Sequence, residues 1–292
     1  MASYTGKERI LAAWKGERTD RVSFNVDIGP HYSPVLNYKV EDYFGNIDTA
    51  IEIQVKSVSD YTSDIITVPQ NIFGWFGLSS CYRFKTRSDE MADGCVKDLD
   101  AVEDLEAIPP AEIQGLELLK DSCGRINELA PDYASRTAVL GPILDAARLM
   151  GLEDWILTTN DNPDMIHKLM RLTTDATKER ALEIVNNADL SVVIVADTFA
   201  SISNISPKIY REFVYPYEKE LFEDLQKASA GSKLIGVHIC GFVDPIMEDI
   251  CSLPIDWIEL DGPSSLEKLF DASKGKMIIR GNVGGELFSE GT

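Results

Sequence analysis

The sequence is poor in basic residues and in cysteine, and it has no long hydrophobic run. Lysine and arginine together number 28 against 48 aspartates and glutamates, so the formal net charge is −20. A surface this acidic repels phosphate backbones and anionic lipids, which argues against nucleic-acid and membrane partners. The 5 cysteines are odd in number and show no disulfide framework spacing. We therefore expect reduced thiols in a cytosol-like compartment.

Export and membrane-spanning segments are also missing from the pattern. The first residues, MASYTGKERILAAW, lack the apolar core of a signal peptide. No later stretch approaches the roughly 18 uncharged apolar residues of a transmembrane helix. We predict a soluble, cytoplasmic protein.

Short apolar runs that alternate with longer helical patterns dominate the 292 residues, of which 44% are hydrophobic. This alternation is typical of parallel strands covered by helices. A chain of this length could form two domains of ~150 residues, but an α/β barrel of this size can be one. The expected strands are Val22 to Val26, Asp64 to Val68, Thr137 to Leu140, Val192 to Ala196, Leu234 to Ile239, Trp257 to Leu260 and Met277 to Gly281.

Helix signals lie between these runs. Thr5 is placed to cap a first helix, Pro163 to begin a later one, and Ser206 with Pro207 to open a third that Pro216 should kink or break. No glycine-rich phosphate fingerprint follows the first strand, so we predict a single (β/α)8 TIM-type barrel over residues 1–292 rather than an open sheet. We expect a rim insertion, as a hairpin or long loop, around residues 71–98. Either the chain lacks the last β/α unit or the strand count is one short.

The best candidate site follows the strand 234–239. His238 and Cys240 are two residues apart, so both side chains can face one point at the carboxyl end of the strand. An imidazole and a thiolate are a suitable pair for zinc. The alternative is a locally hydrogen-bonded histidine beside a small core cysteine, which is the commoner use of such residues.

Other polar residues follow the remaining strands and are candidates for the substrate pocket, because catalytic side chains in such barrels lie at the carboxyl ends of the strands. Each has an alternative use as a surface residue, a cap, a buried pair or a turn. These candidates are His31, Asp197, Glu259, Asp261 and Asn282.

Several segments together resemble the uroporphyrinogen decarboxylase-like superfamily, and within it the zinc-dependent, cobamide-linked methyltransferases. The segments occur in the family's order over nearly the whole chain. They are residues 5–22 (TGKERILAAWKGERTDRV), 141–153 (GPILDAARLMGLE), 197–201 (DTFAS), 205–213 (ISPKIYREF), 215–216 (YP), 281–283 (GNV) and 291–292 (GT). Residues 238–241, HICG, match the methyltransferase branch's His-x-Cys zinc motif.

The resemblance implies that His238 and Cys240 are catalytic zinc ligands. It further implies methyl transfer between a cobamide on a separate corrinoid protein and a small substrate, either a thiol acceptor or a methylated donor. The branch has a third zinc ligand, a cysteine after the eighth strand. We expect either that the natural protein extends past Thr292 to supply it or that the gene product is degenerate. Cys251, on the next predicted helix, is a poor substitute.

Two other functions stay open. A uroporphyrinogen decarboxylase-type decarboxylase grips porphyrinogen carboxylates with an arginine-rich segment near the first strand. Here no arginine occurs between Arg21 and Arg83, which disfavours that activity. The other alternative is a non-catalytic barrel that binds a substrate or docks the corrinoid protein.

Overall fold

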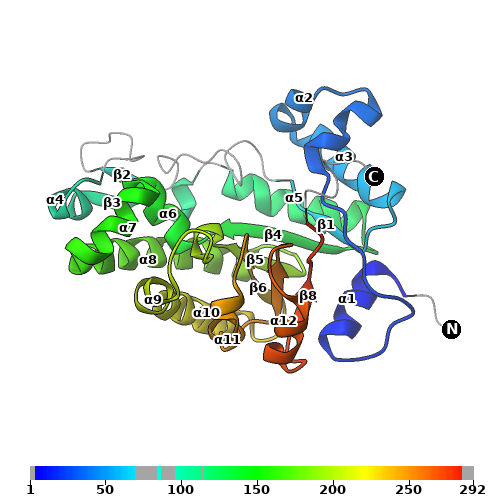
Figure 1. The fold of residues 1–292 in the computed structure, drawn as a ribbon. Helices are drawn as coiled ribbons and strands as arrows, with labels where there is room; N and C mark the ends of the chain where they lie inside the picture. Colours follow the sequence, from blue (N-terminus) through cyan, green and yellow to red (C-terminus); the bar gives the residue numbers. More distant parts are fainter. Residues whose placement is uncertain (1–3, 70–83, 87–95, 114, 285–292) are drawn as a thin grey trace. The chain divides into compact units, whose positions relative to one another are not determined.

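A six-stranded sheet organises the chain, in the strand order β1-β4-β5-β6-β7-β8. The computed structural model describes residues 4–69, 84–86, 96–113 and 115–284 (Figure 1). Neighbouring strands run parallel where β1 pairs with β4, β6 with β7 and β7 with β8. The strands are β1 (Ile65–Thr67), β4 (Ala134–Leu140), β5 (Val192–Ala196), β6 (Leu234–Ile239), β7 (Trp257–Leu260) and β8 (Ile278–Arg280).

Burial on both faces explains the composition of these strands. Every residue of β5, with the sequence VVIVA, is buried, as expected for a parallel strand with helices on both sides. The predicted ranges of β5, β6 and β7 are confirmed, and those of β1, β4 and β8 differ only at their ends. The α/β class and the TIM-type arrangement of alternating strands and helices are therefore those expected from the sequence.

The helices begin at the predicted caps. Thr5 forms a capping box with Glu8, α8 begins at Pro163, and the Ser206 hydroxyl accepts the Ile209 N–H at the start of α9. The helices are α1 (Gly6–Trp14), α2 (Val40–Gly45), α3 (Ile47–Asp60), α4 (Leu99–Glu103), α5 (Leu116–Leu129), α6 (Pro142–Met150), α7 (Leu152–Asp161), α8 (Pro163–Asn187), α9 (Pro207–Ile209), α10 (Tyr215–Ser229), α11 (Met247–Cys251) and α12 (Leu266–Ser273).

Shorter helical turns lie at strand ends and between helices. They are the 3-10 segments η1 (Gly29–Leu36), η3 (Pro110–Glu112), η4 (Thr198–Ala200) and η6 (Asp244–Ile246), and the π-helical segment η5 (Tyr210–Val214). The segment η5 lies directly before α10, where Pro216 occupies the first turn. The predicted break at Pro216 is therefore present as a change of helix type. No helix of the described residues has the length and apolar character needed to cross a membrane.

The prediction of a strand at Val22 to Val26 is wrong. The Phe24 carbonyl accepts the Asp64 N–H at 2.7 Å, but the Phe24 N–H is donated to the Asp64 carboxylate and the Val26 N–H to the Ser63 hydroxyl. Side-chain oxygens thus accept the N–H groups that backbone carbonyls of a neighbouring strand would accept in a sheet. Val22 is also 88% exposed, so the apolar run does not mark a buried strand here.

A second, two-stranded sheet pairs β2 (Phe84–Thr86) with β3 (Leu105–Ala107) in antiparallel register. The strand β2 falls within the rim insertion expected around residues 71–98. Most of that range, with Cys81 and Cys95, lies outside the described residues.

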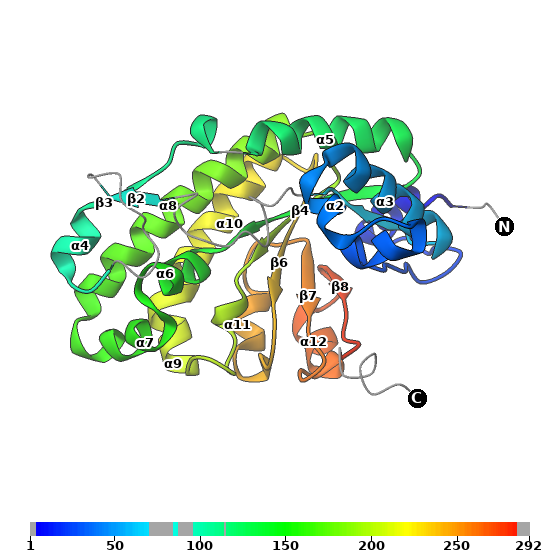
Figure 2. The same ribbon diagram turned by 90° about the horizontal axis from the view of Figure 1, so that it is seen from above.

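Two compact units divide the chain. Unit 1 comprises residues 1–78, 114–138 and 183–193, and unit 2 comprises 79–113, 139–182 and 194–292. In unit 1 a core forms around Ile51, Ile66 and Ile126. In unit 2 the strands β6, β7 and β8 lie side by side (Figure 2), and α10 packs on β6. The extent of a single domain over residues 1–292 stays a prediction.

Candidate active site

His238 and Cys240 meet at the end of β6 in unit 2. The Nε2 atom of His238 lies 2.9 Å from the Sγ atom of Cys240, within hydrogen-bonding distance. Both side chains are partly buried. The alternation expected from the sequence therefore brings the two functional groups to one point, as the strand geometry requires.

The neighbouring strands complete a row of charged side chains. The parallel register places Glu259 of β7 beside His238, and Arg280 of β8 beside Glu259. The Oε2 atom of Glu259 lies 3.1 Å from His238 Nδ1, and its Oε1 atom lies 2.8 Å from Arg280 Nη1. The buried Trp257 indole N–H also donates to Oε1 at 3.3 Å. The carboxylate thus holds the histidine ring from the side opposite Cys240.

This arrangement shifts both proton equilibria. Burial lowers the pKa of His238, but the hydrogen bond with Cys240 and the pairing with Glu259 outweigh burial and raise the pKa to about 9. The hydrogen bond with His238 in turn holds the pKa of the Cys240 thiol below its usual value. The contact therefore favours the protonated ring of His238 and increases the share of Cys240 present as thiolate, which is the nucleophilic form of the sulfur.

Close packing between strands keeps β6 against β7. A Cβ atom on Gly236 would lie 2.7 Å from the Cβ atom and carbonyl oxygen of Trp257. A larger residue at this position would therefore separate the strands that hold His238 and Glu259 in register.

Asp261 and Asn282 bind the loops around the site. Asp261 Oδ2 accepts the N–H of Gly241, directly after Cys240, at 2.9 Å. The Asn282 side-chain amide donates to the Ser264 carbonyl at 2.7 Å, and the Ser264 hydroxyl donates to the Gly241 carbonyl at 3.0 Å. These contacts fix the loop that follows β6. A direct role for either residue toward substrate stays a prediction.

Asp197 is fully buried and caps a helix. Its carboxylate accepts the N–H groups of Ile143 and Leu144 at 3.4 and 3.0 Å, at the start of α6. A Cβ atom on Gly141 would lie 2.6 Å from both carboxylate oxygens, so the glycine makes room for the cap. The substrate contact predicted for Asp197 is untested, and its described hydrogen bonds are those of a cap.

Glu218 is a buried acid that the sequence does not single out. Its Oε2 atom accepts the Tyr210 hydroxyl at 2.6 Å, and its Oε1 atom has no hydrogen-bond partner among the described residues. Burial raises its pKa to about 7, although the hydrogen bond from Tyr210 lowers it. Burial, followed by the neighbouring charge of Glu218, raises the pKa of Asp197 well above its usual value.

His31 belongs to unit 1, where it is exposed on η1 and lines a pocket formed by residues of that unit. Cys251, on α11 of unit 2, lines a groove with residues of α12. Burial raises the pKa of Cys251 to about 11, so it is a poor thiolate donor. Among the residues that the structure describes, no group of three or more His, Cys, Asp or Glu side chains is arranged to hold a metal ion.

The fold defines an α/β protein of the TIM-barrel type, and the comparisons identify its family. The profile of uroporphyrinogen decarboxylase (URO-D) matches residues 5–291. The chain therefore belongs to the uroporphyrinogen decarboxylase family, which confirms the resemblance drawn from its motifs.

A solved methyltransferase structure shares this fold at low sequence identity. A methyltransferase from Methanosarcina mazei has a TM-score of 0.75 and 19% identity, over 96% of this chain and 83% of that chain. A protein described as a vitamin-B12-independent methionine synthase from Listeria monocytogenes has a TM-score of 0.48 and 13% identity, over 89% of this chain and 78% of that chain. None of the curated proteins matches the chain.

Proposed function

We propose that the chain is a methyltransferase of the URO-D family that moves a methyl group between a corrinoid protein and a small substrate. The observation that carries this proposal is the contact of 2.9 Å between His238 Nε2 and Cys240 Sγ, with Glu259 behind the ring. The Methanosarcina mazei protein of similar fold is described as a methyltransferase, which supports the same reaction class.

The donor set suits zinc as part of a site. Zinc prefers imidazole nitrogen and thiolate sulfur, and a metal-bound histidine commonly has its second nitrogen held by a carboxylate. His238 and Cys240 supply the two donors, and Glu259 occupies the position of that carboxylate. The third protein ligand is not among the described residues. When bound, zinc would make a thiol acceptor nucleophilic or polarise the oxygen of a methyl donor.

The chain's own residues prepare the site for either substrate. Glu259 orients the His238 ring and balances its positive charge, while Arg280 offsets the negative charge of Glu259. Asp261 accepts the N–H of Gly241 and so holds the backbone directly after Cys240. Zinc takes a neutral imidazole and a thiolate, so its binding would displace the proton of His238 Nε2, and the lowered pKa of Cys240 makes the thiol proton easier to release.

Decarboxylation is the competing activity, because it is the reaction after which the family is described. Two arginines of the six-stranded sheet already have carboxylate partners: Arg280 pairs with Glu259 and Arg136 with Asp27. A substrate with many carboxylates would need arginines that can be released to it. We therefore favour methyl transfer.

Metal content tests the proposal directly. We expect the purified protein to hold close to one zinc per chain and to demethylate methylcobalamin in the presence of a simple thiol such as 2-mercaptoethanol. The double variant His238→Ala/Cys240→Ala should lose both properties. Cys251→Ser removes a thiol elsewhere in unit 2 and should keep both. Zinc retained by the double variant would contradict the assignment, and decarboxylation of a porphyrinogen without cobamide turnover would favour the competing activity.

A further inference from the structure

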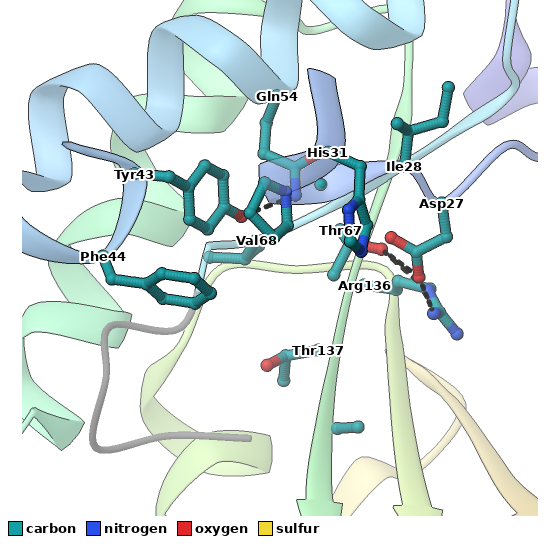
Figure 3. Close-up of a pocket in the computed structure, with 13 residues that line it drawn as sticks. Asp27, Ile28, His31, Tyr43, Phe44, Gln54, Thr67, Val68, Arg136 and Thr137 are labelled. Carbon is teal, nitrogen blue, oxygen red and sulfur yellow. Dashed lines mark hydrogen bonds and ion pairs between the residues drawn. The ribbon is translucent and has the colours of Figure 1, made fainter. Parts of the chain in front are cut away.

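Unit 1 contains a pocket of about 250 Å³ that is formed by η1, the helices α2 and α3 and the strands β1 and β4 (Figure 3). All of its lining residues belong to this unit. Its volume is slightly below the roughly 300–1,000 Å³ of sites for drug-sized ligands. The pocket is therefore suited to a small molecule, and its lining includes neither His238 nor Cys240.

One end of the pocket holds a balanced pair of charges. Asp27 Oδ2 lies 2.5 Å from Nη2 of the buried Arg136 and also accepts the Thr67 hydroxyl at 3.2 Å. Arg136 Nε donates to the same hydroxyl at 3.0 Å. Because each charge already has an opposite partner, a charged ligand would have to compete with an existing ion pair. This end of the pocket favours an uncharged ligand.

A hydrogen-bond acceptor is left at this end. The other carboxylate oxygen, Asp27 Oδ1, takes no hydrogen bond from the described residues, and Figure 3 shows it on the side of His31. A carboxylate oxygen in this setting accepts a hydroxyl or amide hydrogen.

The opposite end offers a hydrogen-bond donor. The buried Gln54 amide donates to the Tyr43 hydroxyl at 2.8 Å, so the tyrosine proton is directed elsewhere. A Cβ atom on Gly29 would lie 3.7 Å from that amide and 4.0 Å from that hydroxyl. Since Gly29 has a φ of +50°, a side chain there would be strained, and the backbone stays close to this polar pair.

Apolar and aromatic groups also line the pocket. Val68 is fully buried, and the rings of Phe44, Tyr43 and His31 line the pocket in Figure 3. Such a lining favours a flat apolar body, because ring faces and edges contact aromatic side chains over a large area.

We propose that this pocket binds a small uncharged molecule with a flat apolar body, a hydroxyl group at one end and a second oxygen at the other. The hydroxyl donates to Asp27 Oδ1, and the second oxygen accepts the Tyr43 hydroxyl proton. A carboxylate in place of the second oxygen would bring an unbalanced negative charge into a site whose arginine is already paired. An ammonium group would meet an aspartate that is already paired.

Three probes of nearly equal size test the charge preference: 4-hydroxybenzyl alcohol, 4-hydroxybenzoate and 4-hydroxybenzylamine. Binding to the full chain is measured by calorimetry and by ligand-observed NMR. We expect the alcohol to bind at least about tenfold more tightly than either charged probe, a ratio that corresponds to about 1.4 kcal/mol. Equal or tighter binding of a charged probe, or no binding of the alcohol at millimolar concentrations, would overturn the proposal.

Two variants locate the site. Tyr43→Phe removes one hydrogen-bond donor and should weaken the binding of 4-hydroxybenzyl alcohol by about tenfold, the usual scale of one hydrogen bond. Asp27→Asn removes the negative charge that pairs with Arg136 in this pocket, so it should shift the preference toward 4-hydroxybenzoate. A folded Asp27→Asn protein that still prefers the alcohol would contradict the charge argument.

The metal-site double variant His238→Ala/Cys240→Ala separates this pocket from the proposed function. It should bind the alcohol as the wild type does, even if its zinc is lost. Loss of alcohol binding in that variant, together with unchanged binding in Tyr43→Phe, would place the ligand elsewhere and refute the inference.

Discussion

The reactivity of Cys240 in metal-free protein is the sharpest test of the geometry at the end of β6. The ring nitrogen of His238 lies 2.9 Å from the sulfur, and although burial lowers the His238 pKa, the contacts with Cys240 and Glu259 together raise it to about 9. His238→Ala removes the cation. His238→Gln keeps a hydrogen-bonding group without the charge. Both variants should raise the pKa of Cys240 and slow its alkylation.

The size of this effect follows from the distance. An opposite charge this close lowers an acid's pKa by roughly 1–3 units, so its removal reduces the thiolate fraction by about 10- to 1,000-fold at a pH below both pKa values. A thiolate of higher pKa is more nucleophilic, with a Brønsted coefficient of about 0.4–0.5, which restores nearly half of the loss on a logarithmic scale. We expect alkylation to slow by roughly 3- to 60-fold in His238→Ala.

Iodoacetamide labelling of chelator-treated protein, followed by peptide mass spectrometry, reads Cys240 separately from the other cysteines. Cys251 is a suitable internal reference, because burial raises its pKa to about 11 independently of His238. Equal Cys240 labelling rates and equal pH midpoints in the wild type and both variants would show that the histidine does not act on the sulfur, and the imidazolium–thiolate pair would then be abandoned.

Two further predictions concern buried acids in unit 2. Gly141→Ala would place a methyl carbon 2.6 Å from both carboxylate oxygens of Asp197. Overpacking and a weakened helix cap should together lower the free energy of unfolding in urea by ~2–4 kcal/mol. A loss below about 0.5 kcal/mol would contradict this packing. Burial raises the pKa of Glu218 to about 7, so the folded state holds a proton that the unfolded chain releases near pH 4.5. The free energy of unfolding should therefore fall as the pH rises from about 4.5 to 7, and this group should account for on the order of 3 kcal/mol of the fall. Glu218→Gln should remove that part of the decline, while its amide oxygen still accepts the Tyr210 hydroxyl. Identical pH profiles of the two proteins in chemical unfolding would refute the assignment of a buried neutral acid.

Most of the sheet could be predicted from the sequence because buried parallel strands consist of continuous apolar runs. The runs at Val192 to Ala196, Leu234 to Ile239 and Trp257 to Leu260 match β5, β6 and β7 end to end. The strand predicted at Val22 to Val26 is absent, because the side chains of Asp64 and Ser63 accept the backbone N–H groups that a neighbouring strand would otherwise pair with. The run does not report burial either, because Val22 is 88% exposed, and no hydrophobic pattern reports which group satisfies each N–H.

The candidate site was predictable only along one strand. Spacing of two residues brings His238 and Cys240 together whatever the rest of the fold does. The contribution of Arg280 was not predictable, because it depends on the register of β8 against β7. The same holds for Glu218, a helical residue whose burial beside Asp197 no local pattern indicates.

By itself, then, the sequence determined which residues alternate into the strands, where the helices are capped, and that an imidazole and a sulfur share one side of β6, since these properties follow from local backbone geometry. Only the tertiary structure decided that Glu259 and Arg280 form a charged row beside His238, that Asp197 caps α6, and that Asp27 pairs with Arg136. Each of these contacts joins segments far apart in the chain, and their distances depend on strand register and helix packing rather than on residue spacing.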